Sequence, residues 1–247
     1  EFFEAADVRL CSMSATSAVT ARDPGDVADR SDYPVSDLLG LSIILRVNVL
    51  NKAGFSECAD ATIERLTSRR LQNSSNAAAA TDEPLPPGYN IAPSTTQPVI
   101  RQSRDTFARE LVGMRWGLIG FGSAGPDPKR ATFNARCENL EKSSLWRVPL
   151  HKRRCLVPIS GYYEWRKPDK APFRFTLVDQ PMFGLAGLWD AWKSPAGDWL
   201  QSFSIITVQA NTAMSPIHDR MPAILSPQDY DEWLDRGEVE RAPIHLL

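Results

Sequence analysis

Residues 153–165 read RRCLVPISGYYEW, and this stretch predicts how the chain folds. Its apolar run, 155–159, is followed by the turn signal Ser160-Gly161 and then by alternating aromatic residues. This order is typical of two adjacent strands joined as a hairpin. Strand-like segments recur at 97–101, 110–119, 172–178, 182–192 and 199–208, and short helices are expected at 140–148 and 228–234. The sequence therefore predicts a mostly β fold with α decoration, of the α+β class.

Glu164 is the unusual residue of this stretch, because it stands between Tyr163 and Trp165 where a strand normally places another packing residue. Two interpretations are open. On a solvated edge strand, Glu164 would be an ordinary surface carboxylate. In apolar surroundings, desolvation would raise its pKa, which suits a general acid or base.

The composition is that of an ordinary globular protein. The chain has 247 residues, of which 43% are hydrophobic and 23% charged, enough for one sizeable domain with extensions or two small ones. Nineteen prolines favour a loop-rich or β-rich architecture over a helical bundle. The net charge is −2, yet residues 129–174 contain 12 Lys and Arg against 4 Asp and Glu. This basic segment indicates an anionic partner, unless its charges are scattered by chance over several faces.

The cysteines and histidines predict no metal site. Cys11, Cys58, Cys137 and Cys155 show no paired spacing, and the three histidines complete no zinc pattern. Reduced thiols of an intracellular protein fit best. The most apolar segment, 38–50, is too short to span a bilayer, so neither a membrane partner nor a targeting segment is expected.

The first third of the chain differs from the rest. Residue 1 is Glu, which indicates a fragment, a processed product or a gene model that lacks its start. Residues 1–83 contain few aromatic residues and a small-residue tract, so they are expected to be a divergent, largely disordered or mispredicted segment with one helix at 58–71. The composition changes at Pro84. A single domain is therefore expected at 84–235, followed by a tail at 236–247.

Four polar residues stand among apolar neighbours: Asn90, Asn134, Glu164 and His218. Taken singly they are weak signals, since such a histidine is more often structural and a loop asparagine more often a turn former. If residues 133–138 are extended, Asn134 and Arg136 share one face while Cys137 points the other way as a packing thiol. Arg136 would then offer a fork of donors suited to a phosphate.

Eight short motifs occur in a specific order along the chain. They are YNIAP (89–93), MRWGL (114–118), NAR (134–136), RCLVP (154–158), GYYEW (161–165), AGLW (186–189), TVQAN (207–211) and HDRMP (218–222). In series they resemble the SRAP family, the SOS response-associated peptidase or abasic-site processing proteins. The resemblance covers about residues 84–235.

This resemblance implies a compact, barrel-like β domain with a basic groove for single-stranded DNA that contains abasic sites. It implies a sensor in the DNA damage response that crosslinks itself to the lesion through an amino-terminal cysteine, as a thiazolidine. Self-processing peptidase activity and reversal of the crosslink are also implied. Neither a cofactor nor a metal is expected. We expect a monomer, located in the nucleus of a eukaryote or otherwise in the cytoplasm or nucleoid.

The resemblance also implies a role for particular residues. Asn134 would position the reacting amine, Glu164 would shuttle protons, and His218 would act as a second acid or base. Arg136 would hold the flanking phosphate. The path of the DNA strand would be lined, by charge and by stacking, with Asn90, Arg115 and Trp116.

The chain departs from the family at its start, because the motif Met-Cys-Gly-Arg is not found. Cys11 is followed by Ser and Cys58 by Ala. Without an α-amine on the same residue, a thiol cannot close a thiazolidine. Three hypotheses therefore remain: an abasic-site sensor whose true start is missing, a catalytically dead module that binds single-stranded DNA, or a cysteine peptidase using Cys58 or Cys11 with His218.

Overall fold

The central apolar run becomes a buried strand. The computed structural model describes residues 8–12, 44–47, 88–127, 130–178, 180, 182–237 and 241–247. Here the run forms β7 (Arg154–Ile159), in which all six residues are buried. Burial of both faces explains why this strand is continuously apolar rather than alternating. It lies between β4 (Thr96–Gln102) and β10 (Phe183–Lys193), antiparallel to both.

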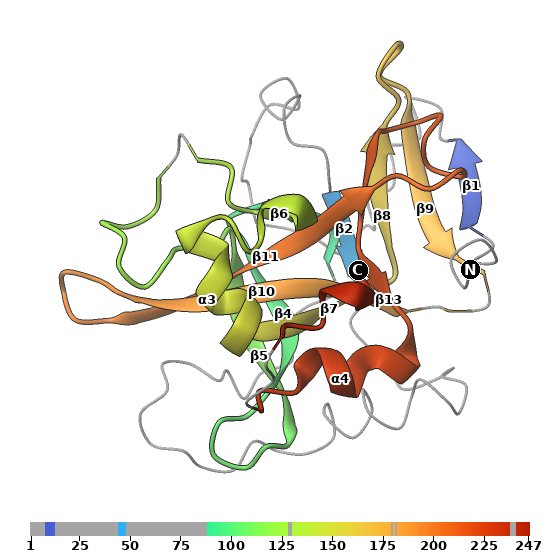
Figure 1. The fold of residues 1–247 in the computed structure, drawn as a ribbon. Helices are drawn as coiled ribbons and strands as arrows, with labels where there is room; N and C mark the ends of the chain where they lie inside the picture. The colour runs from blue at the N-terminus through green and yellow to red at the C-terminus, as the bar shows by residue number, and fades with distance from the viewer. Residues whose placement is uncertain are drawn as a thin grey trace.

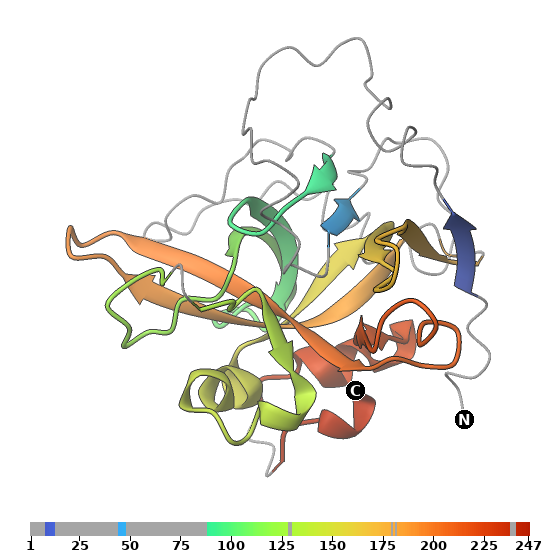
Figure 2. The ribbon, with the colours of Figure 1, turned by 90° about the horizontal axis from the view of Figure 1, so that it is seen from above.

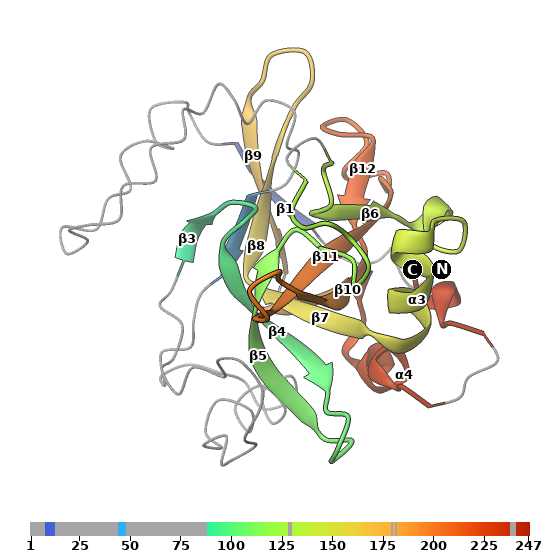
Figure 3. The ribbon, with the colours of Figure 1, turned by 90° about the vertical axis from the view of Figure 1, so that its left-hand side faces the viewer.

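Five strands close into a barrel (Figures 1 and 3). β5 (Arg109–Trp116) pairs with β4, and β11 (Trp199–Gln209) pairs with both β5 and β10, which completes the ring β11-β5-β4-β7-β10. Three short strands extend it: β6 (Asn134–Arg136) and β12 (Arg220–Pro222) on β11, and β13 (Ile224–Leu225) on β10. The prediction of a mostly β, barrel-like domain with α decoration is confirmed.

A second sheet stands beside the barrel. Its order is β1-β9-β8-β2-β3, from β1 (Val8–Ser12), β9 (Pro172–Leu177), β8 (Gly161–Trp165), β2 (Ile44–Val47) and β3 (Gly88–Ile91). The predicted hairpin of β7 and β8 is therefore wrong, because the chain leaves the barrel at Ser160 and β8 joins the second sheet. Gly161 permits this corner, since a Cβ there would lie 2.7 Å from the carbonyl oxygen of Phe175.

The helices lie together on one side of the barrel (Figure 2). They are α3 (Ser144–Lys152) and α4 (Tyr230–Leu234), with 3-10 turns η3 (Cys137–Asn139), η4 (Pro227–Asp229) and η5 (Ile244–Leu246). The first helix was predicted at 140–148 and starts later, at Ser144, because residues 140–142 form a turn that follows η3. Arg154 joins both helices to β7, since its guanidinium donates to the carbonyls of Leu150 and Trp233, each at 2.6 Å.

Two hydrophobic clusters make up the core. One packs the helices on the barrel through Trp146, Leu150 and Trp233. The other joins the barrel to the second sheet, where the rings of Tyr162 and Phe175 stack with centroids 5.1 Å apart. The second cluster matters for function, because the candidate site residues extend from the strands that enclose it.

The amino-terminal third is described only in part. β1 and β2 show that it contributes two strands to the second sheet. The helix predicted at 58–71 lies outside the described residues. No helix in the described part of the chain is long and apolar enough to cross a membrane.

Candidate functional site

Glu164 is buried in β8. Its relative exposure is 1%, which excludes the solvated edge-strand alternative. The residue pairs across to Phe173 of β9, and its side chain shares the face of Tyr162, two positions earlier on the strand. Tyr162 belongs to the core between the two sheets, so the carboxyl group is held in largely apolar surroundings.

Burial raises the pKa of the Glu164 carboxyl to about 9. A backbone hydrogen bond from Trp165 and the charge of Lys167 oppose this shift, whereas the negative charge of Asp219 increases it. Desolvation is the largest of these effects. Removal of the carboxyl group from water disfavours its ionised form, so the net shift of the pKa is upward. Glu164 is therefore a neutral carboxylic acid at neutral pH, ready to donate a proton.

His218 lies next to Asp219 in the loop that leads from β11 to β12. The backbone N–H of Arg220 donates to His218 Nδ1 at 3.0 Å. The carbonyl oxygen of Arg220 lies 3.1 Å from the same nitrogen, so Nδ1 contacts the backbone of Arg220 in either tautomer. Nε2 has no hydrogen bond to any residue in the described ranges, so it is available to a ligand.

Asp219 connects the two groups electrostatically. Its carboxylate lies 3.4 Å from His218 Nδ1 and accepts a hydrogen bond from Lys167 Nζ at 2.8 Å. This hydrogen bond lowers the pKa of Asp219, which stays ionised next to neutral Glu164. Lys167 lies in the turn between β8 and β9, so the ion pair fastens that turn to the histidine loop. The structure thus brings Glu164, Asp219 and His218 into one acid–base cluster.

Asn134 and Arg136 lie on the neighbouring strand β6, which runs parallel to β11. Asn134 Oδ1 is buried and accepts no hydrogen bond, so it is an unused acceptor. Arg136 is exposed and forms no ion pair with a described residue. Phe133, Phe173 and Ile217, adjacent to the site residues in sequence or sheet, all pack in the same core cluster. Asn134 therefore directly follows a residue of this core, and the contacts of the described residues do not join it to Glu164.

Two of the three residues expected to line the DNA path are placed differently, and the third is not tested. Trp116 is fully buried, stacks on Phe203 with centroids 6.4 Å apart, and donates Nε1–H to Phe133 O at 2.9 Å. It therefore acts as a core residue and offers no free ring face. Arg115 donates to Gly117 O and Ser94 Oγ, which commits its guanidinium to the turn after β5. Asn90 lies in β3, and its side chain is outside what the structure describes.

Two residues that the sequence interpretation did not assign complete the site. Lys167 is absent from every motif used, and only the fold brings it to Asp219. Arg220 forms an ion pair with Glu138 at 2.6 Å, which fixes the start of η3 next to β12. Arg220 and Asp219 both belong to the motif HDRMP. Their place in this motif was the one sequence feature that could have indicated a role in the site. No group of three metal-ligating side chains occurs among the residues that the structure describes.

The raised pKa of Glu164 predicts a pH-dependent stability. The folded chain keeps a proton up to about pH 9, whereas an unfolded glutamate releases it near pH 4.5. The free energy of unfolding should therefore fall as pH rises between these values. Glutamine does not titrate, so Glu164→Gln removes this pH dependence. As pH rises, the free energy of unfolding of the variant should therefore increase relative to that of the parent by up to about 1.4 kcal/mol per pH unit. Urea unfolding at about pH 5 and pH 8 measures the difference; parallel curves would contradict it.

The chain is similar to proteins of one family. Residues 58–247 match the family described as SOS response associated peptidase (SRAP). The abasic site processing protein YoqW of Bacillus subtilis is 38% identical over 152 residues, which cover 60% of this chain and 67% of YoqW. The abasic site processing protein HMCES of Xenopus tropicalis is 34% identical over 184 residues, 62% of this chain and 55% of HMCES, so the chain spans about half of that relative.

Solved structures show the same architecture. A protein from Bacteroides thetaiotaomicron matches with a TM-score of 0.57 and 31% identity, over 64% of this chain and 72% of that protein. A protein from Bordetella bronchiseptica matches with a TM-score of 0.57 and 25% identity, over 78% and 87%. The family match covers well over half of the sequence, and it includes the acid–base cluster and β6. The chain therefore belongs to the SRAP family.

Proposed function

We propose that this protein processes abasic sites in single-stranded DNA, and that it forms a covalent crosslink with the sugar aldehyde. The observation that carries the proposal is the neutral, buried Glu164 beside the ionised Asp219 and the open Nε2 of His218. The names of the relatives support the same substrate class, since they are abasic site processing proteins.

The chemistry requires protons to move at each step. Opening the closed sugar moves the proton of its hydroxyl to the ring oxygen and leaves an aldehyde. An amine adds to the aldehyde, and the resulting hydroxyl leaves as water when Glu164 protonates it, which gives an iminium ion and the Glu164 carboxylate. The iminium nitrogen then loses its proton to His218, which leaves the neutral imine. A thiol then adds to the imine carbon while its proton moves to the nitrogen. Glu164 acts as the general acid in these steps, and His218 returns the proton to the Glu164 carboxylate.

Asn134 and Arg136 fit supporting roles. The unused Oδ1 of Asn134 can accept an N–H of the attacking amine and hold it near the aldehyde. Arg136, exposed at the end of β6, can pair with a phosphate next to the lesion. These roles need no metal and no cofactor.

Neither Cys137 nor Cys155 fits the role of the nucleophile. Burial raises the pKa of both Cys155 and Cys137, and Cys155 is fully buried, so neither is a reactive thiolate. The amino-terminal cysteine that the proposal requires is therefore neither of these two. Hydrolysis of the peptide bond before the reactive cysteine would give it the α-amine that ring closure needs.

A crosslinking assay tests the proposal. The protein is incubated with a single-stranded oligonucleotide carrying one abasic site, and with an intact oligonucleotide as control, before denaturing electrophoresis. We expect a slower band with the abasic strand only, and weaker crosslinking with Asn134→Ala. Peptide mapping of the band identifies the attached residue. Salt-sensitive binding without any covalent band would overturn the proposal in favour of a non-covalent DNA-binding module.

A further inference from the structure

A pair of exposed aromatic rings lies far from the acid–base cluster. Five large hydrophobic side chains are exposed in the described ranges: Phe107, Phe121, Val148, Trp199 and Ile244. Of these, Phe121 and Trp199 stack on each other, with ring centroids 6.3 Å apart and planes inclined by 23°. Lys193 Nζ lies 5.9 Å from the Trp199 ring. We call these three residues, Phe121, Trp199 and Lys193, the aromatic platform.

The platform is held rigidly although it is exposed. Trp199 and Lys193 face each other across the β10–β11 hairpin, which extends beyond the neighbouring strands (Figures 1 and 2). The backbone N–H of Phe121 donates to the buried carboxylate of Asp190 at 3.1 Å. Trp192 Nε1–H donates to Ser123 O at 2.9 Å and ties the same loop to the hairpin. The backbone that carries the two rings is therefore tied to the hairpin before a ligand binds, which lowers the entropic cost of binding.

The size of the platform indicates its ligand. A stable protein interface buries roughly 800 Å² on each partner, far more than two side chains offer. One or two aromatic rings are enough to bind a nucleobase by stacking, and a neighbouring lysine can contact its phosphate. Asp198 lies in the same turn, and its negative charge offsets the positive charge of Lys193. Lys193 can therefore contact one phosphate, but the turn is not a broad positively charged surface. The geometry fits an unpaired nucleotide better than a protein partner.

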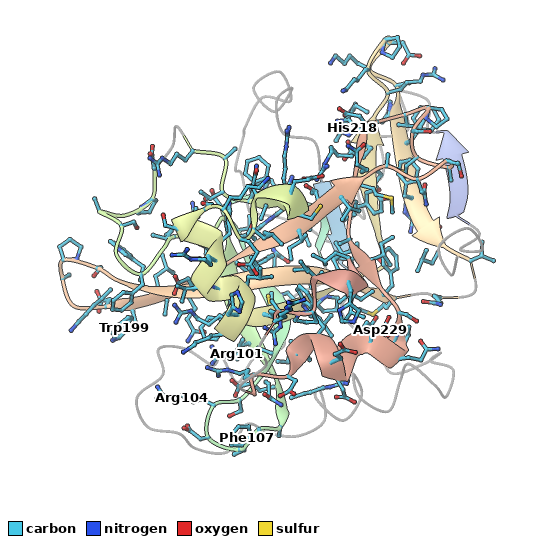
Figure 4. The ribbon with its side chains drawn as sticks, viewed as in Figure 1. Arg101, Arg104, Phe107, Trp199, His218 and Asp229 are labelled. Atoms are coloured by element: carbon cyan, nitrogen blue, oxygen red, sulfur yellow. The ribbon has the colours of Figure 1, made fainter. Side chains whose placement is uncertain are left out.

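The platform and the candidate site lie at opposite ends of β11. Trp199 starts the strand, while Thr207 pairs with Arg136 near its other end. Eight residues of strand span about 27 Å, at about 3.4 Å per residue. Figure 4 shows Trp199 and His218 on opposite sides of the molecule. A strand of duplex DNA rises about 3.4 Å per nucleotide and an unpaired strand is more extended, so at most about eight nucleotides cover that distance.

We infer that Phe121, Trp199 and Lys193 form a second single-stranded DNA subsite, which stacks bases several nucleotides away from the abasic site. The inference rests on the proposed function, because it extends the same DNA strand along β11. It also assigns a role to the projecting β10–β11 hairpin, which the acid–base cluster does not use.

Fluorescence anisotropy with intact oligothymidylates of about 4, 8, 12 and 16 nucleotides tests this subsite. The double variant Phe121→Ala/Trp199→Ala should bind the two longer strands about 5- to 100-fold more weakly, and the shortest one as tightly as the parent does. Trp199→Phe should retain the affinity within about twofold, because it keeps a stacking ring. Phe107→Ala, which removes another exposed ring, is the matched control.

The outcomes separate this inference from the proposed function. Equal binding of all lengths by the double variant and the parent would overturn the subsite alone. A parent protein that binds no single-stranded DNA would overturn both. In support, Lys193→Gln should reduce the slope of log affinity against log salt by about 0.7, the value for one lost phosphate contact with a single strand.

Discussion

Glu164→Gln is expected to slow crosslink formation on abasic single-stranded DNA by about 10²- to 10⁴-fold, the range that general acid–base catalysis contributes. Glutamine has nearly the same shape, but it cannot release a proton to the departing water. Glu164 is neutral at neutral pH, so the substitution changes no charge in the bound state. Affinity for intact single-stranded DNA should therefore stay within about twofold of the parent.

Single-turnover crosslinking, followed on denaturing gels at neutral pH, measures this rate. Glu141→Gln is the matched control, because Glu141 is a surface carboxylate that contacts His151 and is remote from β8. The control should react at the parental rate. A Glu164→Gln rate within about threefold of the parent would show that the buried carboxyl group is not the proton donor.

Trp116→Ala is expected to lower the free energy of unfolding by about 3–5 kcal/mol, as large-to-small substitutions of buried aromatic residues do. The ring is fully buried between Phe203 and Phe133, and its indole N–H bonds to the carbonyl of Phe133. Because Phe133 precedes Asn134, loss of this contact also loosens a candidate site residue. Chemical denaturation measures the change.

Trp116→Phe separates packing from the hydrogen bond. It keeps most of the stacking on Phe203, so it should cost only about 1–2 kcal/mol. Phe107→Ala, at an exposed ring, should change stability by less than about 0.5 kcal/mol. An unchanged stability of Trp116→Ala together with weaker DNA binding would contradict the core assignment and restore Trp116 as a DNA-stacking residue.

Much of the fold could be predicted from local pattern. The segments at 172–178, 182–192 and 199–208 became β9, β10 and β11, because each is a short run rich in apolar and aromatic residues that is bounded by turn residues. The pairing of β7 and β8 could not be predicted. The same Ser160-Gly161 signal serves a hairpin and a corner between two sheets, and only long-range packing decides between them.

The candidate site was predictable where one residue conflicted with its neighbours. The position of Glu164 between two aromatic residues left a surface and a buried interpretation open, and the structure decides for the buried one. Trp116 was misplaced, since an aromatic residue next to an arginine fits either face of a strand. Lys167 could not be found, because its partner Asp219 lies 52 residues away and only the fold brings them to 2.8 Å. Contacts of this kind leave no local pattern in the sequence.

The titration of Glu164 tests the central claim most directly. Protein labelled with ¹³C at glutamate carboxyl groups can be followed by NMR from about pH 4 to pH 10, and the spectrum of Glu164→Gln assigns the resonance. The buried acid predicts a carboxyl signal that remains protonated at neutral pH and titrates with a midpoint of about 9. A midpoint near the ordinary glutamate value of about 4.3 would contradict the account.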